Sequence, residues 1–440
     1  MSIAIPVRVA RTARRTRFAS AMRTLALLAV ANLGAGLALA QSSPPGRSVE
    51  SLLEIAREKN PEFAAMRYEA DAVGDRIGPA GAFPDPAFRI EWRNFTNEGS
   101  EAAPSLNPSK VGSTKYTVLQ PLPFFGKRDL KREVAEADSE AAMRRADGTW
   151  LELATKIKGA YTQYYYNAQT LRLTREVLEL LARLESVAQA RYSGGLGAQQ
   201  DAIRAQVEQT SLRADLYAQE SELARAKTRV NSLIARGPRE PLAEPERLRA
   251  LPPPARLQPA DLEERARARN PKLAAEDARI RAADKTVELT DRNRYPDFAI
   301  GLSPIQSGNR ISEWELMLEV AIPLQLDTRR SQEREARAMA SAARSRRDAT
   351  ANDALGELAE NLVALETARR IESLAGGSLL PQAELTFQSA LAGYENGKVD
   401  FTTLLDAQRQ IQRAKQERLK AQAEAQMRFA DIERIVGEDL

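Results

Sequence analysis

The sequence predicts a mostly α-helical protein with a small β part, made of two similar halves. Charged residues are 28% of the 440 residues and aromatic residues only 5%, which is typical of long helices with solvated faces. Short motifs recur in the same order in both halves, and residues 126–192 contain no proline. The chain has no cysteine and no histidine. This excludes disulfides, thiol catalysis and any mechanism that needs an imidazole.

Residues 1–40 are predicted to be a secretory signal. They contain six arginines and no acidic residue, and an apolar run follows that ends in Ala38-Leu39-Ala40, the pattern of a cleavable signal. A membrane anchor is the alternative, but glycine and asparagine interrupt the run. A start at Met22 would leave a shorter signal of the same kind. The chain holds 64 basic and 60 acidic residues, and without the six N-terminal arginines its net charge is −2. No nucleic-acid partner is therefore expected.

The rest of the chain repeats itself. The stretch "AREKNPEF" at 56–63 matches "ARARNPKL" at 266–273, and "YSGG" at 192–195 matches "YENG" at 394–397. Each half is expected to contain a helix, two strands, a very long helix, a glycine-containing turn and a further helix. The predicted parts are a first repeat, a proline-rich crossover and a second repeat, at 41–237, 238–258 and 259–440. Seven prolines between 237 and 259 exclude one regular helix there, which leaves an ordered crossover or a flexible linker.

Four short strands are predicted, two in each repeat: about 86–96, 112–122, 297–304 and 311–323. In the first and the last, apolar and charged residues alternate, which predicts a sheet with one apolar and one solvated face. The apolar set is Phe88, Ile90, Trp92, Trp314, Leu316, Leu318 and Val320. The charged set is Arg89, Glu91, Arg93, Glu313, Glu315 and Glu319.

The apolar face of this sheet needs a cover. Packing on helices is one alternative, but the predicted helices look too long and too polar to fold back over it. If the face meets lipid, open strand edges would leave backbone groups unpaired, so the sheet has to close. Four strands are too few for a barrel, whereas three copies supply twelve. The second alternative therefore predicts a trimer whose charged set lines a water-filled lumen and whose apolar set faces lipid.

The predicted helices are unusually long. Residues 126–192 would span roughly 100 Å at 1.5 Å per residue. In the second repeat a break is expected at "AGGSLLPQ", because Pro381 lacks an amide hydrogen and crowds the preceding turn. Each long helix ends in a predicted tip, at 193–198 and at 395–399, where glycine permits the positive φ of a tight turn.

Taken in this order, the features resemble the TolC-like family of outer-membrane efflux proteins. The resemblance covers the chain after residue 40 and rests on the duplication, on "QPLPFFGKR" at a strand-to-helix junction, and on the tips "YSGGLGAQQDAIRAQ" and "YENGKVDFTTLLDAQRQ". "PFFGKR" and "LLPQAEL" are most similar to the cation-efflux (CzcC/CusC-type) branch. The resemblance implies a homotrimer in the outer membrane, with a twelve-stranded β-barrel, four strands per chain, joined to a long periplasmic α-helical barrel. It also implies a periplasmic adaptor and an inner-membrane pump, of the RND type, as partners, and no cofactor.

The resemblance also implies roles for particular residues. Phe124 and Phe125 would lie at the membrane boundary, where aromatic residues are favoured. The tip residues would contact the adaptor: Gly194, Gly195, Leu196, Gly197, Asn396, Gly397, Lys398 and Val399. Turn geometry alone also explains their glycines. Asp406 occupies the position of an acidic ring in the closed periplasmic constriction, although a solvated helix face explains it equally well. Thr403 stands where some relatives carry a second acid, and Asp201 stands where relatives have a polar link between the tips.

The expected function is a passive exit duct of a tripartite efflux system, with heavy-metal cations as one candidate cargo. No catalytic constellation and no metal-binding motif is recognisable in the sequence, so conduction and gating are the expected mechanism. The alternatives are a periplasmic coiled-coil scaffold or adaptor without a pore, and an outer-membrane channel for drug efflux or type I secretion.

Overall fold

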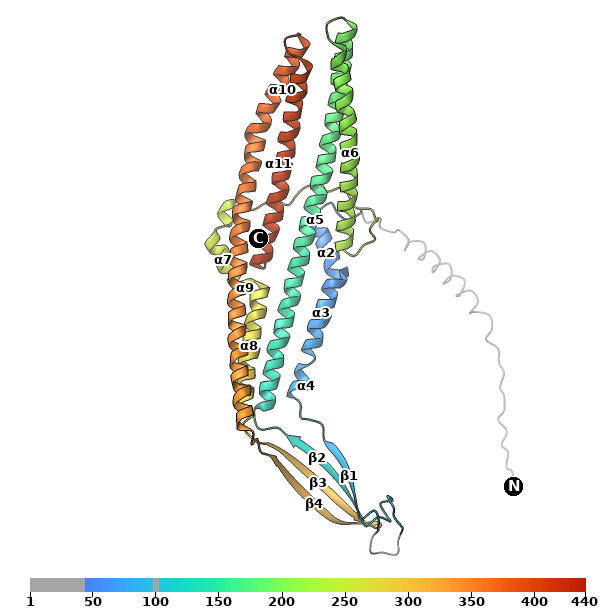
Figure 1. Ribbon diagram of the computed structural model, residues 1–440, viewed down its shortest axis with the longest axis vertical. Helices are drawn as coiled ribbons and strands as arrows, with labels where there is room; N and C mark the ends of the chain where they lie inside the picture. The colour runs from blue at the N-terminus through green and yellow to red at the C-terminus, as the bar shows by residue number, and fades with distance from the viewer. Residues whose placement is uncertain (1–43, 98–102) are drawn as a thin grey trace, which may run out of the picture. The chain divides into compact units, whose positions relative to one another are not determined.

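The computed structural model describes residues 44–97 and 103–440 (Figure 1). The predicted signal, residues 1–40, lies outside them, and residues 46–440 form one unit. Its helices are α2 Val49–Lys59, α3 Pro61–Gly74, α4 Ile77–Gly81, α5 Lys127–Ser193, α6 Gln199–Leu233, α7 Pro259–Arg269, α8 Pro271–Arg292, α9 Leu326–Leu374, α10 Leu380–Glu395 and α11 Phe401–Val436. None of the helices within the described ranges combines the length and the hydropathy needed to cross a membrane. The mostly helical class with a small β part is confirmed.

Four antiparallel strands form one sheet in the order β1-β2-β3-β4. They are β1 Ala87–Arg93, β2 Ser113–Leu122, β3 Asp297–Ser307 and β4 Arg310–Ala321. Strand β1 is shorter than the expected 86–96, because Asn94 takes a φ of 51° and turns the chain out of the sheet. Strand β3 is longer than the expected 297–304 and has an irregularity in its pairing with β4 between Ile305 and Gln306. Among the residues that the structure describes, the two outer strands, β1 and β4, each have one unpaired edge.

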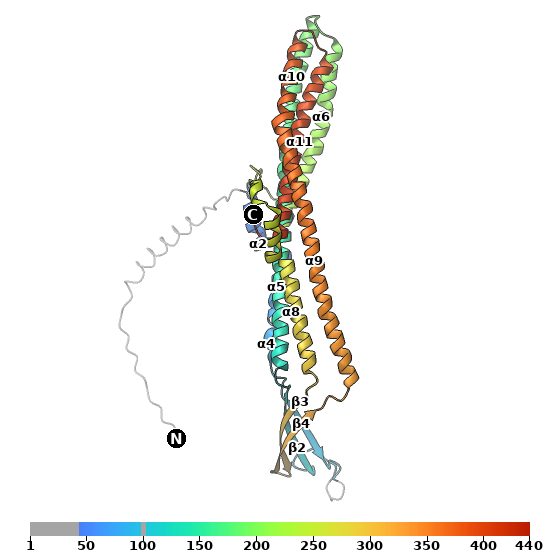
Figure 2. The same ribbon diagram turned by 90° about the vertical axis from the view of Figure 1, so that its left-hand side faces the viewer.

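The sheet has one apolar and one polar face, and neither is covered by the long helices. The register places Phe88, Val118, Leu302 and Leu316 in one row across the four strands, and Leu316 is 78% exposed. Figures 1 and 2 show the sheet beyond the ends of α5, α8 and α9. The alternative of a sheet packed on helices is therefore wrong for the described residues.

On the polar face, side chains pair across strands. The ammonium of Lys115 in β2 pairs with the Glu315 carboxylate in β4. The hydroxyls of Thr117 and Ser303 lie 2.8 Å apart and share a hydrogen bond. The first contact spans β3 and the second joins β2 to β3, so together they tie three strands on the face that the sequence predicts to be solvated.

Helix α5 runs without interruption for 67 residues. It packs against α6, α8, α11 and α3, so several neighbours share the burial of its apolar positions. The second long helix differs, because a π-helical turn, Ala375–Leu379, joins α9 to α10. The break expected at Pro381 thus takes the form of a wider turn within a continuous helical path. Such a turn accommodates a residue that cannot donate its amide hydrogen.

The duplication is visible at equivalent helix corners. Asn60 caps α3, since its Oδ1 accepts a hydrogen bond from the Phe63 amide at 3.1 Å, and its Nδ2 donates to the Leu233 carbonyl at 2.8 Å. Asn270 caps α8 in the same manner and donates to the Ile435 carbonyl at 2.8 Å. In each half, one buried asparagine therefore fixes the short helices to the end of the returning helix, α6 or α11.

The proline-rich crossover passes across α5 towards α7 in an extended path with one 3₁₀ turn, Pro254–Arg256 (Figure 1). The buried phenols of α5 hold it: the Tyr161 hydroxyl donates to the Arg247 carbonyl and the Tyr164 hydroxyl to the Ala243 carbonyl, each at 3.0 Å. Of the two possibilities that the sequence leaves open, these contacts favour the ordered crossover.

A buried ion cluster joins the crossover to the last helix. Glu433 in α11 is 3% exposed and accepts hydrogen bonds from Lys158 at 2.7 Å and from the Leu440 amide at 3.0 Å. The Glu433 carboxylate also forms an ion pair with the Arg249 guanidinium of the crossover. Lys158 also pairs with Asp439 at 2.6 Å, so two acids and two bases balance at this point.

Candidate functional site

Two helical hairpins end side by side at the end of the molecule away from the sheet (Figure 1). One joins α5 to α6 and the other joins α10 to α11. Gly195 and Gly397 have φ values of 70° and 71°, a conformation that glycine adopts without strain. The Leu196 amide donates to the Arg191 carbonyl and the Lys398 amide to the Gly393 carbonyl, each at 2.8 Å. Both tips therefore end their long helix with the same bonded turn.

The residues of the tips are mostly open to solvent. Leu196 is 72% exposed, and Gly194, Gly195, Asn396, Gly397 and Lys398 are also exposed. Gly197 and Val399 are half-buried. An exposed apolar side chain at the extremity of a hairpin is available for contact with another protein. The adaptor-contacting role of these tips stays a prediction.

Arg191 connects the two tips. Its Nη2 donates to the Leu196 carbonyl at 2.9 Å and its Nη1 donates to the Glu395 carbonyl of the other hairpin. Its guanidinium carbon lies 5.1 Å from the centre of the Tyr394 ring, within the range of a cation–π contact. One side chain thus holds both turns at a fixed separation.

Asp201 and Tyr394 form a second link between the hairpins. The Tyr394 hydroxyl donates to Asp201 Oδ2 at 3.2 Å, and Tyr394 is only 4% exposed. Burial and the adjacent Asp201 carboxylate raise the pKa of Tyr394 to about 12. The phenol therefore stays protonated and can act as a donor throughout the physiological pH range.

Asp406 is exposed, and Arg409 lies beside it. The distance from Arg409 Nη1 to Asp406 Oδ1 is 3.3 Å. The same guanidinium makes two bonds to Glu208 in α6, at 2.6 Å and 3.1 Å, the forked geometry that gives strong ion pairs. Arg409 therefore partly neutralises Asp406 and ties α11 to α6.

Thr403 lies at the start of α11, where it completes a helix cap. Its amide donates to Asp400 Oδ1 at 2.9 Å, and its hydroxyl donates to the same atom. Arg204 in α6 pairs with the neighbouring Thr402. The structure does not join Thr403 to Asp201 or Asp406 by a hydrogen bond. The predicted role of Thr403 in a gate stays a prediction.

Sequence reasoning missed four residues of this site: Arg191, Glu208, Tyr394 and Arg409. Two weak signals in the sequence point to two of these residues. Tyr394 belongs to the repeated Tyr-x-x-Gly turn, and Arg409 stands one helical turn after Asp406. Neither signal names the partner on the other hairpin.

At the sheet, the structure separates the two predicted sets. Phe88, Ile90, Trp92, Trp314, Leu316, Leu318 and Val320 share one face and are all exposed. Arg89, Glu91, Arg93, Glu313, Glu315 and Glu319 share the other. That the apolar set faces lipid and the charged set faces water stays a prediction.

At the strand-to-helix junction, the ring of Phe124 stacks on Tyr295 at 4.6 Å, and Phe125 is 84% exposed. The predicted boundary residues thus form an outward aromatic cluster. Its position at a membrane surface stays a prediction.

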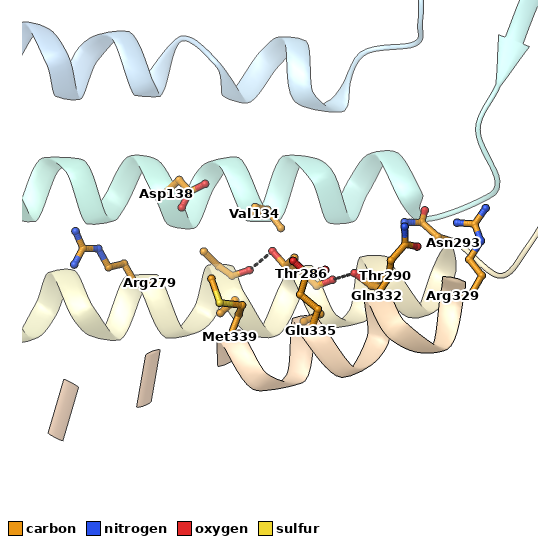
Figure 3. Close-up of a pocket in the computed structure, with 13 residues that line it drawn as sticks. Val134, Asp138, Arg279, Thr286, Thr290, Asn293, Arg329, Gln332, Glu335 and Met339 are labelled. Atoms are coloured by element: carbon orange, nitrogen blue, oxygen red, sulfur yellow. Dashed lines mark hydrogen bonds between the residues drawn. The ribbon is translucent and has the colours of Figure 1, made fainter. Parts of the chain in front are cut away.

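A cavity of about 560 Å³ lies among α5, α8 and α9 (Figure 3). Asp138 comes from α5, Arg279 from α8 and Glu335 from α9, so charges of both signs line it. Burial raises the pKa of Asp138, while Arg145 and Arg279 oppose that effect. The Thr286 hydroxyl is already bound to the Ala282 carbonyl at 2.8 Å. Within residues 44–97 and 103–440, no group of three or more acidic side chains could hold a metal ion.

Comparison with known proteins identifies the family. The chain matches the model "Outer membrane efflux protein" over residues 52–236 and 262–438. It is 24% identical to the cobalt-zinc-cadmium resistance protein CzcC of Cupriavidus metallidurans, with 93% of this chain and 98% of that protein covered. Among solved structures, it superimposes on CusC with a TM-score of 0.76 at 17% identity, which covers 89% of this chain and 92% of that one. It superimposes on the outer-membrane channel OprN with a TM-score of 0.74 at 21% identity, which covers 90% and 95%.

These findings confirm the resemblance drawn from the tips and the duplication, and they favour a channel over a scaffold without a pore. The chain therefore belongs to the outer membrane efflux protein family, whose members are not enzymes but the outer-membrane exit ducts of tripartite efflux systems.

Proposed function

We propose that three copies of this chain form a passive duct through the outer membrane, closed at its periplasmic end by the hairpin tips. Metal cations are the proposed cargo. The partners are a periplasmic adaptor and an inner-membrane pump of the RND type.

The observation that carries the proposal is the exposed apolar face of an open four-stranded sheet. Trp314 and Leu318, for example, are 63% and 68% exposed. In hydrocarbon the free edges of β1 and β4 would each leave a row of backbone groups unpaired, at a cost of several kcal/mol per group. Pairing β4 of one copy with β1 of the next removes every edge. Three copies then supply the twelve strands of a closed barrel.

The same arrangement assigns the two faces. The apolar set meets acyl chains, and the charged set lines a water-filled lumen. Phe124 and Phe125 mark the periplasmic boundary of the membrane, and α5 then extends about 100 Å away from it, at 1.5 Å per residue for 67 residues. The exposed tips at the far end are where an adaptor would dock.

At the tips, Asp406 from three copies would converge on the axis. Like charges repel, and a ring of carboxylates attracts cations. Arg409 reduces that repulsion, because it lies 3.3 Å from Asp406. The links from Arg409 to Glu208 and from Tyr394 to Asp201 hold the α10–α11 hairpin against α6 and thereby favour the closed state.

A cation cargo is consistent with the chemistry of the path. The relative CzcC is named for cobalt, zinc and cadmium resistance. A duct must let its cargo leave as well as enter, so weak sites suit conduction better than tight ones. The charged set of the sheet offers carboxylates in a polar lumen, and no three-carboxylate cluster occurs in the described part of the chain.

The experiment is a recording from single channels of the Asp406→Ala variant in planar bilayers. We expect a change in conductance, or a loss of block by multivalent cations applied from the periplasmic side. Asp147→Ala is the matched control, because this acid pairs with Arg144 on α5 far from the tips. Unchanged conductance together with unchanged block would contradict the acidic constriction.

A further inference from the structure

An apolar cavity lies where the sheet meets α5. It measures about 500 Å³, within the range of about 300–1,000 Å³ that is typical of small-molecule sites. Its walls are Leu122 and the Pro123–Gly126 turn, the starts of α5 and β3, and Leu318 of β4. We call it the rim groove. Its lining is mostly apolar, with Arg128 and Asp129 as the two charged residues.

The rim groove continues the apolar face of the sheet. Ile300 and Leu318 are paired in the register of β3 and β4, are 45% and 68% exposed, and line the groove. Phe125, which is 84% exposed, also lines the groove. A lipid acyl chain that lies along the sheet can therefore enter the groove without crossing a polar surface.

A fixed cation stands at the helical end of the groove. The Nε of Arg128 donates to the Gly81 carbonyl at 2.9 Å, and its guanidinium carbon lies 3.4 Å from the centre of the Phe83 ring. This contact holds the plane of the guanidinium. Within the described residues, 44–97 and 103–440, neither Nη group of Arg128 makes a hydrogen bond or an ion pair. Two donors are thus free to bind a phosphate, for which arginine is well suited.

An acid stands next to this cation. The Asp129 carboxylate is 68% exposed, and its ion pair with Arg132 is long, at 3.9 Å. An anionic headgroup would meet attraction from Arg128 and repulsion from Asp129. A headgroup that carries a phosphate and an ammonium complements both charges.

We infer that the rim groove binds one phospholipid with a phosphoethanolamine headgroup. One acyl chain lies in the groove, the phosphate binds Arg128 and the ammonium binds Asp129. The inference rests on the proposed function, because that function places the apolar face of the sheet in the membrane. It adds a specific lipid site at the periplasmic rim, which would fix the height of the barrel in the membrane.

The test is native mass spectrometry of the purified protein, released from detergent after incubation with phosphatidylethanolamine or phosphatidylglycerol. For the wild type we expect preferential retention of phosphatidylethanolamine. Arg128→Gln should weaken retention about tenfold, the effect of losing a charge-assisted hydrogen bond. Arg144→Gln is the control, since it removes an equal charge from the same helix about 24 Å away and should leave retention unchanged.

A second variant makes the headgroup assignment falsifiable. Asp129→Asn keeps the phosphate site but removes the partner of the ammonium, so the preference should move towards phosphatidylglycerol. Equal retention of both lipids by the wild type, or loss of binding in Arg144→Gln as in Arg128→Gln, would overturn the inference. Assembly separates this result from the proposed function. A conducting trimer without headgroup preference contradicts the lipid site alone, whereas a protein that neither assembles nor conducts contradicts the duct itself.

Discussion

The Tyr394 phenol at the end of α10 donates a hydrogen bond to the Asp201 carboxylate near the start of α6, across 3.2 Å and 193 residues of sequence. The bond joins two hairpins that the chain builds separately. Tyr394 is buried against Phe401, with ring centres 5.3 Å apart, so the bond is shielded on one side. It is a direct link between the hairpin that carries Asp406 and its neighbour.

Removal of this link should favour the open state. Tyr394→Phe keeps the ring and deletes only the hydroxyl, while Asp201 stays in place. A hydrogen bond to a charged group contributes about 1.5–3 kcal/mol, so the ratio of closed to open channels should fall about tenfold or more. Single-channel recordings should show a larger mean conductance.

Tyr192→Phe is the matched control for that recording. Tyr192 is the equivalent residue of the first repeat, it is 49% exposed, and its hydroxyl has no hydrogen-bond partner in the part of the chain that the structure describes. If both phenylalanine variants conduct alike, the Asp201–Tyr394 bond does not help to close the duct.

The same link predicts a pH dependence. The pKa of Tyr394 is raised to about 12 from 10.0, so the folded protein keeps a proton that an unfolded phenol releases near pH 10. Its contribution to stability is therefore complete below about pH 10 and disappears between about pH 10 and 12. The tyrosinate absorbance of wild type minus Tyr394→Phe should show one step centred near pH 12. A step centred near pH 10 would mean that the phenol is neither buried nor next to Asp201.

Local patterns made the sheet predictable. Side chains of a strand alternate between faces whatever the strand packs against, so Trp314 and Glu315 already separate in the sequence. The tips could be anticipated for the same reason, since Gly195 and Gly397 mark turns that need a positive φ. The family followed from the order of such local signals.

The contacts between the hairpins could not be predicted. Arg409 meets Glu208, 201 residues away, because the ends of α6 and α11 near the tips share one apolar cluster. Nothing in either segment encodes the partner. The bond from the Thr403 amide to Asp400 is local, since it caps the start of α11, and the place of Thr403 in a gate stays a prediction. At Pro381 the sequence predicted an interruption but not its form, which is a π turn packed against α11.

The two faces of the sheet should respond differently to charge. Leu316→Lys places an ammonium on the apolar face, where lysine costs about 2–4 kcal/mol near the bilayer midplane. Met317→Lys places the same charge one residue further on, on the opposite face, which is the one proposed to line the lumen, and should be tolerated. The free energy of unfolding from lipid vesicles measures both. Equal destabilisation by the two variants would contradict the assignment of the faces.

The buried ion cluster should be sensitive to the loss of one charge. Glu433→Gln leaves Lys158 and Arg249 without their shared acid, and breaking a buried pair costs about 3–5 kcal/mol. We expect a cost at the lower end of this range, because Lys158 keeps its ion pair with Asp439 at 2.6 Å. Glu366→Gln, in an exposed pair with Arg370, should cost less than about 1 kcal/mol. Thermal unfolding of the two variants checks the difference, and similar midpoints would show that Glu433 is not isolated from water.

The central claim is that the sheet of one chain is completed by two further copies. The most direct measurement is the mass of the purified, processed protein in detergent, followed by reconstitution into planar bilayers. We expect a trimer that fractionates with the outer membrane and opens discrete channels. A stable monomer that stays in solution without detergent and carries no current would contradict it.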